Sequence, residues 1–325
     1  MRRQYRCADY TVGWVCALPV ELAAAQLMLD ERHPDLARGA IRDDNLYVLG
    51  TINGHNVVVG CLPAGQTGNN SAAVVATQML ATFKKIRFGL MVGIGGGVPT
   101  HADIRLGDVV VSQPDGTFGG VVQYDMGKST IPGFQRTGSL NSPPQALLNA
   151  LSSVQANEWL GKSELLNYAS RLEGSKFQRS RAGHDTLFDA AYDHEDANSR
   201  TCIACCTDKI QAREPRHPGE EVMVHYGTIA SGNQVMKNAS ERDRASAQLG
   251  GVLCFEMEAA GLMNTFPCLV IRGICDYSDS HKNDKWQPYA AGIAAAYAKE
   301  VLSVVKPVEL AGTQTALNDD KLCGG

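Results

Sequence analysis

The amino-acid sequence predicts a single α/β domain, with a central mixed β-sheet flanked by helices and with one polar insertion. Apolar segments of strand length alternate with helical segments along the chain, and glycine-rich turns separate them. The 325 residues, of which 44% are hydrophobic, are enough to bury a large core. From about residue 155 to 221 this apolar pattern gives way to polar residues, so we expect an excursion from the core there.

Glycine, proline and serine positions divide the first third of the chain into elements. Pro19 suits the first turn of a helix, where its missing N–H costs nothing. Asn53-Gly54 is typical of a tight hairpin turn, and Ser71 is a capping residue before an apolar helical run. We therefore expect a strand at 10–17, a helix at 20–30, a hairpin of strands 46–52 and 56–61, a helix at 71–83 and a strand at 88–94.

The remaining elements follow the same alternation around the polar excursion. Beyond it, an apolar pattern returns at 222–230, and an alanine-rich segment near the end is typical of a long buried helix. We expect a strand at 108–112, a helix at 140–151, a helix at 257–265, a strand at 268–274, a helix at 289–305 and a loose tail at 307–325. The domain would then comprise residues 1–306.

Charge and cysteine usage restrict the class of protein. The formal net charge is -4 and the isoelectric point is about 6.1, which gives no sign of a nucleic-acid or membrane partner. We find no signal peptide and no apolar stretch long enough to span a bilayer. Many of the ten cysteines lie in apolar runs and read as small buried residues: Cys16, Cys61, Cys254, Cys268 and Cys275. We expect a cytoplasmic protein.

Two segments near the end of the chain carry the most informative residues. Glu256 and Glu258 lie two residues apart, directly after an apolar segment of the chain. Arg272 and Asp276 come at the end of a strongly apolar strand. Charged side chains are expensive to bury unless they have partners or a function. Because ligands bind at the carboxyl ends of strands in open α/β sheets, these residues predict a functional site.

Two acidic residues have both a structural and a functional interpretation. Glu21 stands at a strand-to-helix junction, where the helix dipole favours an acid, but a general base at the sheet edge would stand there too. Asp276 fits a turn or an N-cap, or a general acid whose pKa is raised by burial. The nearby Arg272 would make Asp276 harder to protonate unless the guanidinium points elsewhere.

The glycine-rich stretch at residues 93–97 follows a predicted strand. It has neither the Gly-x-Gly-x-x-Gly spacing nor the Lys-Ser/Thr pair of phosphate-binding loops. Close packing of the backbone near a ligand or a neighbouring strand explains these glycines better.

A separate cluster lies in the polar excursion. Cys202, Cys205 and Cys206 follow His194 and precede two further histidines, which gives the segment part of the character of a zinc site. A complete site needs four ligands and the spacing is irregular, so unpaired thiols in a surface loop are the alternative.

Taken together, these residues resemble the nucleoside phosphorylase/nucleosidase superfamily, and most closely its methylthioadenosine/S-adenosylhomocysteine nucleosidase branch. The chain is also similar to fungal members that often stand at the N-terminus of larger innate-immunity-type receptors. The resemblance runs from about residue 10 to 302 and is strongest at 17–21, 93–97, 229–236 with 256–261, and 272–276. It implies the nucleoside phosphorylase-like fold.

The resemblance implies a role for each site residue. Asp276 matches the general acid that protonates the purine at N7. Glu21 matches the carboxylate that positions the attacking water, and Arg272 the arginine beside it. Glu258 matches the carboxylate that holds the ribose hydroxyls, with Met257 packed under the sugar. The other substrate-binding residues would be Val235, Met236 and Trp286 at the base, together with Ile94 and Gly95. No metal ion or cofactor is implied at this site.

The nucleophile can be argued from the same positions. Phosphorylases of this superfamily hold phosphate at positions that here read Met91 and Ile94, and the loop at 18–21 offers no arginine. A dianion needs cationic or N–H donors, so we expect water instead of phosphate. The three carboxylates suit this reaction, because cleavage of an N-glycosidic bond requires protonation of the base and stabilisation of a positively charged sugar.

The resemblance leaves several substrates and activities open. The expected reaction is hydrolysis of a purine ribonucleoside, with adenine-type bases favoured, to free base and ribose. The alternatives are a nucleotide such as ATP as substrate, a phosphorolytic enzyme, and a ligand-sensing or scaffold module without activity. In the nucleotide case six basic residues of the excursion would hold phosphates, or else they are ordinary surface charges: Lys176, Arg179, Arg181, Lys209, Arg213 and Arg216. We also expect a homo-oligomer.

Overall fold

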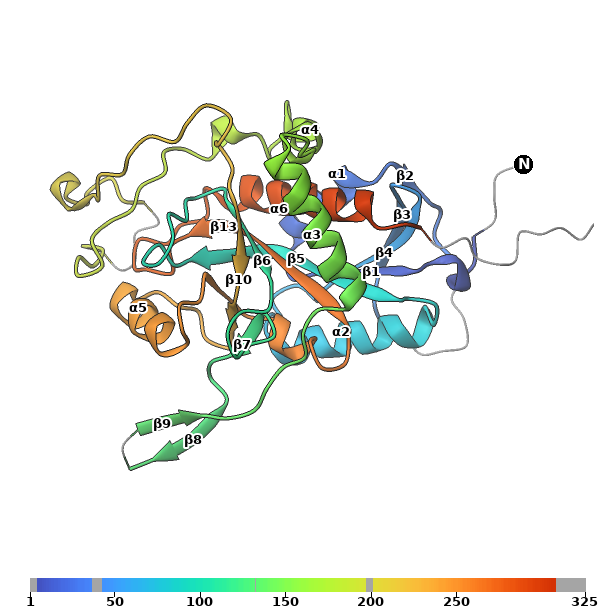
Figure 1. Ribbon diagram of the computed structural model, residues 1–325, viewed down its shortest axis with the longest axis horizontal. Coiled ribbons are helices and arrows are strands. Elements are labelled where there is room, and N and C mark those ends of the chain that lie inside the picture. The colour runs from blue at the N-terminus through green and yellow to red at the C-terminus, as the bar shows by residue number, and fades with distance from the viewer. Residues whose placement is uncertain (1–4, 37–42, 132, 197–200, 308–325) are drawn as a thin grey trace, which may run out of the picture.

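A mixed β-sheet runs through the centre of the computed structural model, which describes residues 5–36, 43–131, 133–196 and 201–307 (Figure 1). In these residues eleven strands belong to the sheet: β1 (Val12–Cys16), β2 (Glu31–Arg32), β3 (Tyr47–Ile52), β4 (His55–Cys61), β5 (Phe88–Gly97), β6 (Val109–Ser112), β7 (Val121–Gln123), β10 (Val224–Gly227), β11 (Ile229–Ser231), β12 (Cys254–Glu256) and β13 (Cys268–Asp276). Two more strands, β8 (Gly127–Thr130) and β9 (Gly133–Arg136), form a hairpin that projects from the domain (Figure 1).

The main path of the sheet runs β10-β6-β13-β5-β1-β4-β3-β2. Strand β1 is parallel to both β4 and β5, and β5 is parallel to β13. Antiparallel pairs join β6 to β13 and β3 to β4, so the predicted mixed sheet is confirmed. Because β1, β5 and β13 are parallel neighbours, their carboxyl ends meet at one edge of the sheet, where ligands bind in such folds.

Helices cover both faces of this sheet. They are α1 (Pro19–Met28), α2 (Asn69–Thr82), α3 (Gln145–Trp159), α4 (Leu165–Ala169), α5 (Ala239–Gln248) and α6 (Gln287–Val304). One face carries α6, which also packs against α1, α3 and α4, while α2 lies across the other face (Figure 1).

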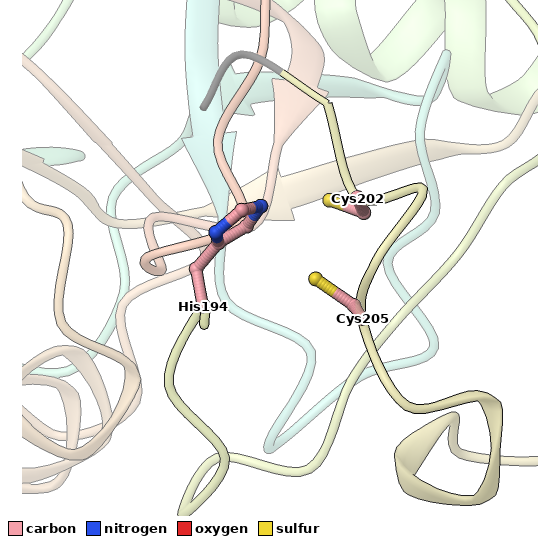
Figure 2. A group of neighbouring side chains, drawn as sticks. All are labelled: His194, Cys202 and Cys205. Atoms are coloured by element: carbon pink, nitrogen blue, oxygen red, sulfur yellow. The ribbon is translucent and has the colours of Figure 1, made fainter. Parts of the chain in front are cut away.

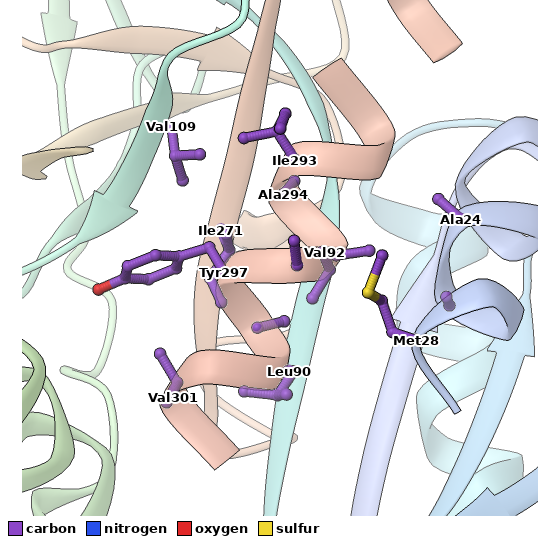
Figure 3. Close-up of a cluster of buried hydrophobic side chains, with 14 of the residues drawn as sticks. Ala24, Met28, Leu90, Val92, Val109, Ile271, Ile293, Ala294, Tyr297 and Val301 are labelled. Carbon is purple, nitrogen blue, oxygen red and sulfur yellow. The ribbon is translucent and has the colours of Figure 1, made fainter. Parts of the chain in front are cut away.

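Helix α6 is the centre of the larger apolar cluster. Ile293 and Tyr297 reach toward the strands that carry Val92 and Ile271, and Met28 of α1 closes the cluster from the side (Figure 3). The helix can approach β13 closely because residue 273 is a glycine. A Cβ atom at this position would collide with the backbone carbonyl of Ala290. This contact holds β13 and its catalytic candidates rigidly against α6.

Several predicted boundaries are wrong. Helix α2 begins at Asn69 and not at Ser71, after Gly68 with φ 100°. Strand β5 continues to Gly97, since β12 pairs with Gly96 and Gly97. The predicted helix at 257–265 is reduced to a short 3-10 turn at Ala259–Gly261 followed by irregular turns. The N–H of Gly261 donates to the carbonyl three residues back, which is the 3-10 pattern, and the N–H of Ala260 donates to the hydroxyl of Ser231.

The polar excursion begins later than expected, because α3 continues to Trp159. Between residues 160 and 221 the described chain holds α4, a few 3-10 turns and long irregular connections (Figure 1). Among the described residues every cysteine is a free thiol. No helix in the described ranges is long and apolar enough to cross a membrane. The predicted tail at 307–325 lies, apart from residue 307, outside the described residues.

Candidate active site

A cavity of about 220 Å³ opens at the edge of the sheet where β1, β5 and β13 end. Seven of the predicted site residues line it: Glu21, Ile94, Gly95, Val235, Met236, Met257 and Glu258. Arg272 and Asp276 lie directly behind its wall, in contact with lining residues. These residues come from five separate parts of the chain, and the fold brings them together at one cavity.

Glu21 is fixed at the start of α1 by the backbone around it. Its carboxylate accepts N–H bonds from Ala17 at 2.7 Å, from Leu18 at 3.0 Å and, across the sheet, from Ile94 at 2.8 Å. Burial raises the pKa of Glu21, while the Arg272 charge and these three N–H donors oppose that shift. The result is a rigid carboxyl group at the bottom of the cavity.

Gly93 lets Glu21 and Arg272 approach each other across β5. A Cβ atom at this position would collide with the Oε1 atom of Glu21 and would lie 2.5 Å from the Nη1 atom of Arg272. The carboxylate and the guanidinium therefore converge over the bare backbone of Gly93. This contact gives a physical reason for the glycine that does not involve phosphate binding.

Arg272 is fully buried and is held by two glutamates of the neighbouring segment. Its Nη2 donates to Glu256 and, at 3.4 Å, to Glu258. Glu256 in turn accepts the backbone N–H groups of Glu258 and Ala259. No role was predicted for Glu256, although its spacing from Glu258 was one of the observations that predicted a site. The structure shows Glu256 as the main partner of Arg272.

Glu258 faces the cavity from the turn after β12. Its Oε1 accepts the N–H of Gly68 at 3.2 Å, and its Oε2 accepts from Arg272. Burial raises the pKa of Glu258 to about 7, with Arg272 opposing the shift and the neighbouring carboxylates Glu256 and Glu21 adding to it. This carboxyl group therefore changes its charge near neutral pH.

Asp276 ends β13 behind the cavity wall, next to the lining residues Ser278 and Lys282. Its carboxylate accepts the backbone N–H of Ser278 at 2.9 Å and the ammonium group of Lys282 at 2.7 Å. Burial disfavours the charge on Lys282, but the adjacent Asp276 outweighs this effect and raises the pKa of Lys282. Arg272 points away from Asp276 and toward the glutamates, so Lys282 is the cation that stabilises the Asp276 carboxylate.

Lys282 was not predicted, and its removal should lower the activity of any reaction that needs Asp276 in a fixed position. In Lys282→Met the Asp276 carboxylate loses its charge-assisted hydrogen bond from the ammonium group, which lies 2.7 Å away. We expect kcat to fall by about ten- to a hundredfold, because a small displacement of a reacting group is costly. Lys285→Met, an exposed lysine of the same loop, is the control. A wild-type kcat in folded Lys282→Met would contradict this arrangement.

Trp286, which was expected against the base, lies outside the described cavity lining. Its ring is buried beneath the Arg179 guanidinium, 4.2 Å from the ring centre, and its Nε1 donates to the carbonyl of His184 at 3.4 Å. Gln287, the next residue, lines the cavity instead. The tryptophan thus links the polar excursion to the start of α6. Its ring packs against Arg179 and does not line the cavity.

The basic residues of the excursion are largely engaged elsewhere. Arg213 pairs with Asp185 at 2.6 Å, and Arg216 pairs with Asp108 at 2.5 Å. Lys176, Arg181 and Lys209 are exposed. None of the six basic residues lines the described cavity, which favours their interpretation as structural or surface charges.

Comparison with known proteins shows the family to which this fold belongs. The chain belongs to the phosphorylase superfamily, because the sequence model of that superfamily matches residues 11–304. It is 48% identical over 305 residues to a nucleotide-binding leucine-rich repeat (NLR)-like protein of Hyaloscypha variabilis. This match covers 93% of the chain and 30% of that relative, so the chain spans less than a third of the relative's length.

Two relatives of lower sequence identity are named as enzymes. The 5'-methylthioadenosine/S-adenosylhomocysteine nucleosidase of Mycobacterium tuberculosis is 23% identical, over 91% of this chain and 96% of the relative. ATP nucleosidase Cap17 of Escherichia coli is 25% identical, over 88% of this chain and 50% of the relative.

Solved structures of two bacterial enzymes confirm the fold. A 5'-methylthioadenosine/S-adenosylhomocysteine nucleosidase from S. pneumoniae, with a transition-state inhibitor, superimposes with a TM-score of 0.56 at 18% identity, over 91% of this chain and 100% of that one. Futalosine hydrolase of Helicobacter pylori gives a TM-score of 0.57 at 16% identity, over 90% and 97%.

Proposed function

We propose that this domain hydrolyses the N-glycosidic bond of purine ribonucleosides, with adenine-type bases favoured, and releases free base and ribose. The observation that carries the proposal is the position of three carboxyl groups at one cavity. Glu21 and Glu258 line it near Arg272, and Asp276 lies behind its wall, bonded to the lining residue Lys282. The names of the relatives, two nucleosidases and a futalosine hydrolase, support the same class of reaction.

Each carboxyl group has a separate part in this reaction. Asp276 transfers a proton to the purine, which makes the base a neutral leaving group. Glu258 accepts hydrogen bonds from the ribose hydroxyls and stabilises the positive charge that develops on the sugar. Glu21, held rigidly by three backbone donors, orients a water molecule toward the anomeric carbon. Met257 and Ile94 supply the apolar surface on which the nucleoside rests.

Water is the nucleophile in this proposal because the charges near Glu21 disfavour phosphate. Arg272 is the nearest cation, but Glu256 and Glu258 already share its guanidinium. With Glu21 included, three carboxyl groups surround one guanidinium, so no free cationic donor remains there for a phosphate dianion. A neutral water molecule meets no such cost.

The test is a direct assay of base release. The purified protein is incubated without phosphate with adenosine, inosine, guanosine, methylthioadenosine and ATP, and free base is measured by chromatography. Release of adenine from a nucleoside supports the proposal, and Asp276→Asn from the same preparation shows that the activity belongs to this site. Release from ATP alone would assign the nucleotide alternative, and no release from any of them would favour the ligand-sensing alternative.

A further inference from the structure

A second group of chemically active side chains lies in the polar excursion, away from the cavity lining. His194, Cys202 and Cys205 each place one potential ligand atom within 4.8 Å of the others. Figure 2 shows both sulfur atoms directed toward the imidazole ring of His194. On a tetrahedral zinc ion two thiolate sulfurs lie about 3.8 Å apart, so this group needs only a small contraction to hold the ion.

His281 is a fourth candidate ligand and has no satisfactory explanation otherwise. It is 7% exposed, and neither of its ring nitrogens has a hydrogen-bond partner among the residues that the structure describes. Its ring centre lies 5.4 Å from that of His194, and the Cys202 thiol contacts its backbone carbonyl at 3.7 Å. A buried imidazole without partners is costly, and a metal ion is a partner that this ring can use.

The surroundings also suit metal binding through histidine. Metal-bound histidines usually direct the other ring nitrogen to a carbonyl or a carboxylate. The Nε2 of His194 lies 3.0 Å from the carbonyl of Thr201, and the Nδ1 of His281 lies 4.0 Å from the carboxylate of Asp279. His194 would then bind through Nδ1, giving up a 3.1 Å contact with the N–H of Asp196, and His281 through Nε2.

We propose that His194, Cys202, Cys205 and His281 form a structural zinc site that fastens the polar excursion to the loop after β13. Two sulfur and two imidazole ligands are a typical closed zinc set, whereas an iron–sulfur cluster of the common type needs four cysteines. Three ligands come from the excursion and the fourth from the loop that follows Asp276. Lys282, the partner of Asp276, directly follows His281, so the metal holds the segment that positions the proposed general acid.

Contacts between protein groups already join the polar excursion to the loop after β13. The N–H of His194 donates to the hydroxyl of Ser280 at 3.0 Å, and Phe188 stacks on His281 with ring centres 4.0 Å apart. His281 lies just outside the group of ligand atoms within 4.8 Å of one another, so its ring must move toward the thiols to bind. Cys206, also outside that group, bonds through its backbone N–H to the hydroxyl of Tyr192. It therefore serves as a matched control for the two proposed thiolate ligands.

The experiment measures zinc and thiol reactivity on the same purified chain. We expect one zinc per chain by elemental analysis, and less than a tenth of that content in Cys205→Ser and in His281→Gln, while Cys206→Ser keeps the full content. In the wild type, Cys202 and Cys205 should resist alkylation until a chelator removes the zinc, which tests the site even if a variant fails to fold.

Three results would overturn the inference. One is a wild-type chain that takes up no zinc and has both thiols reactive. Another is a Cys202–Cys205 disulfide in place of bound metal. The third is a folded Cys205→Ser variant that retains the full zinc content. None of these measurements depends on nucleosidase activity, so the zinc site and the proposed function can fail separately.

Discussion

Replacing Asp276 by asparagine is expected to lower kcat by about a hundred- to ten-thousand-fold, the usual contribution of a positioned general acid. The amide keeps an oxygen that can accept the N–H of Ser278, so the turn after β13 should remain folded. It has no proton to give to the purine, however, and the base must leave as an anion. Because the loss arises in the chemical step, KM should change much less than kcat.

The matched control for this prediction is Asp284→Asn, an exposed aspartate of the same loop. We expect it to retain wild-type activity, and we expect both variants to give the wild-type circular dichroism spectrum. A folded Asp276→Asn variant with at least half of the wild-type kcat would remove Asp276 from the catalytic role.

Replacing Glu258 by glutamine should lower activity and raise stability in the same protein. Loss of a charged acceptor for the ribose hydroxyls is expected to lower kcat/KM about ten- to a hundredfold. The effect on stability follows from the pKa of Glu258, which burial raises to about 7 from its ordinary value of 4.5. Folding therefore favours the protonated carboxyl group of Glu258. The stability that this group contributes is fully present below about pH 4.5 and is lost as pH rises through about 7.

Above pH 7 the ionised Glu258 destabilises the folded protein relative to a neutral group. Glutamine resembles the protonated form, so Glu258→Gln should raise the melting temperature at pH 8 by several degrees. At pH 5 the wild type is already protonated and the two should melt close together. Glu220→Gln, on the surface, is the control. A lower melting temperature for Glu258→Gln at pH 8 would contradict the burial of a costly charge.

Much of this fold could be predicted from local patterns in the sequence. The apolar run before Arg272 and the Asn53-Gly54 turn are short-range signals, and the structure places β13 and the β3–β4 hairpin where these signals predict them. The helix predicted at 257–265 is wrong: the segment forms only a 3-10 turn, which packs on side chains of Ser231 and Asn69 that lie far away in the sequence. Propensity and periodicity contain no information about such long-range partners.

The same limit applies to the site. Glu258 was selected because paired acidic residues after an apolar segment are unusual, and Glu21 was selected by the family resemblance; the structure brings both to one cavity. Lys282 was missed because a lysine in a polar loop gives no signal until the loop folds back on Asp276. Trp286 was placed at the base by its spacing from Asp276, yet the intervening loop turns the ring toward Arg179.

The central claim is that this domain cleaves a nucleoside with water. The most direct measurement identifies the sugar product from adenosine, with and without saturating phosphate, by phosphorus NMR and chromatography. The account predicts free ribose in both reactions and a rate that does not depend on phosphate. Ribose 1-phosphate, formed at a rate that saturates with phosphate, would contradict it, because the three carboxyl groups around Arg272 would then have to accommodate a dianion.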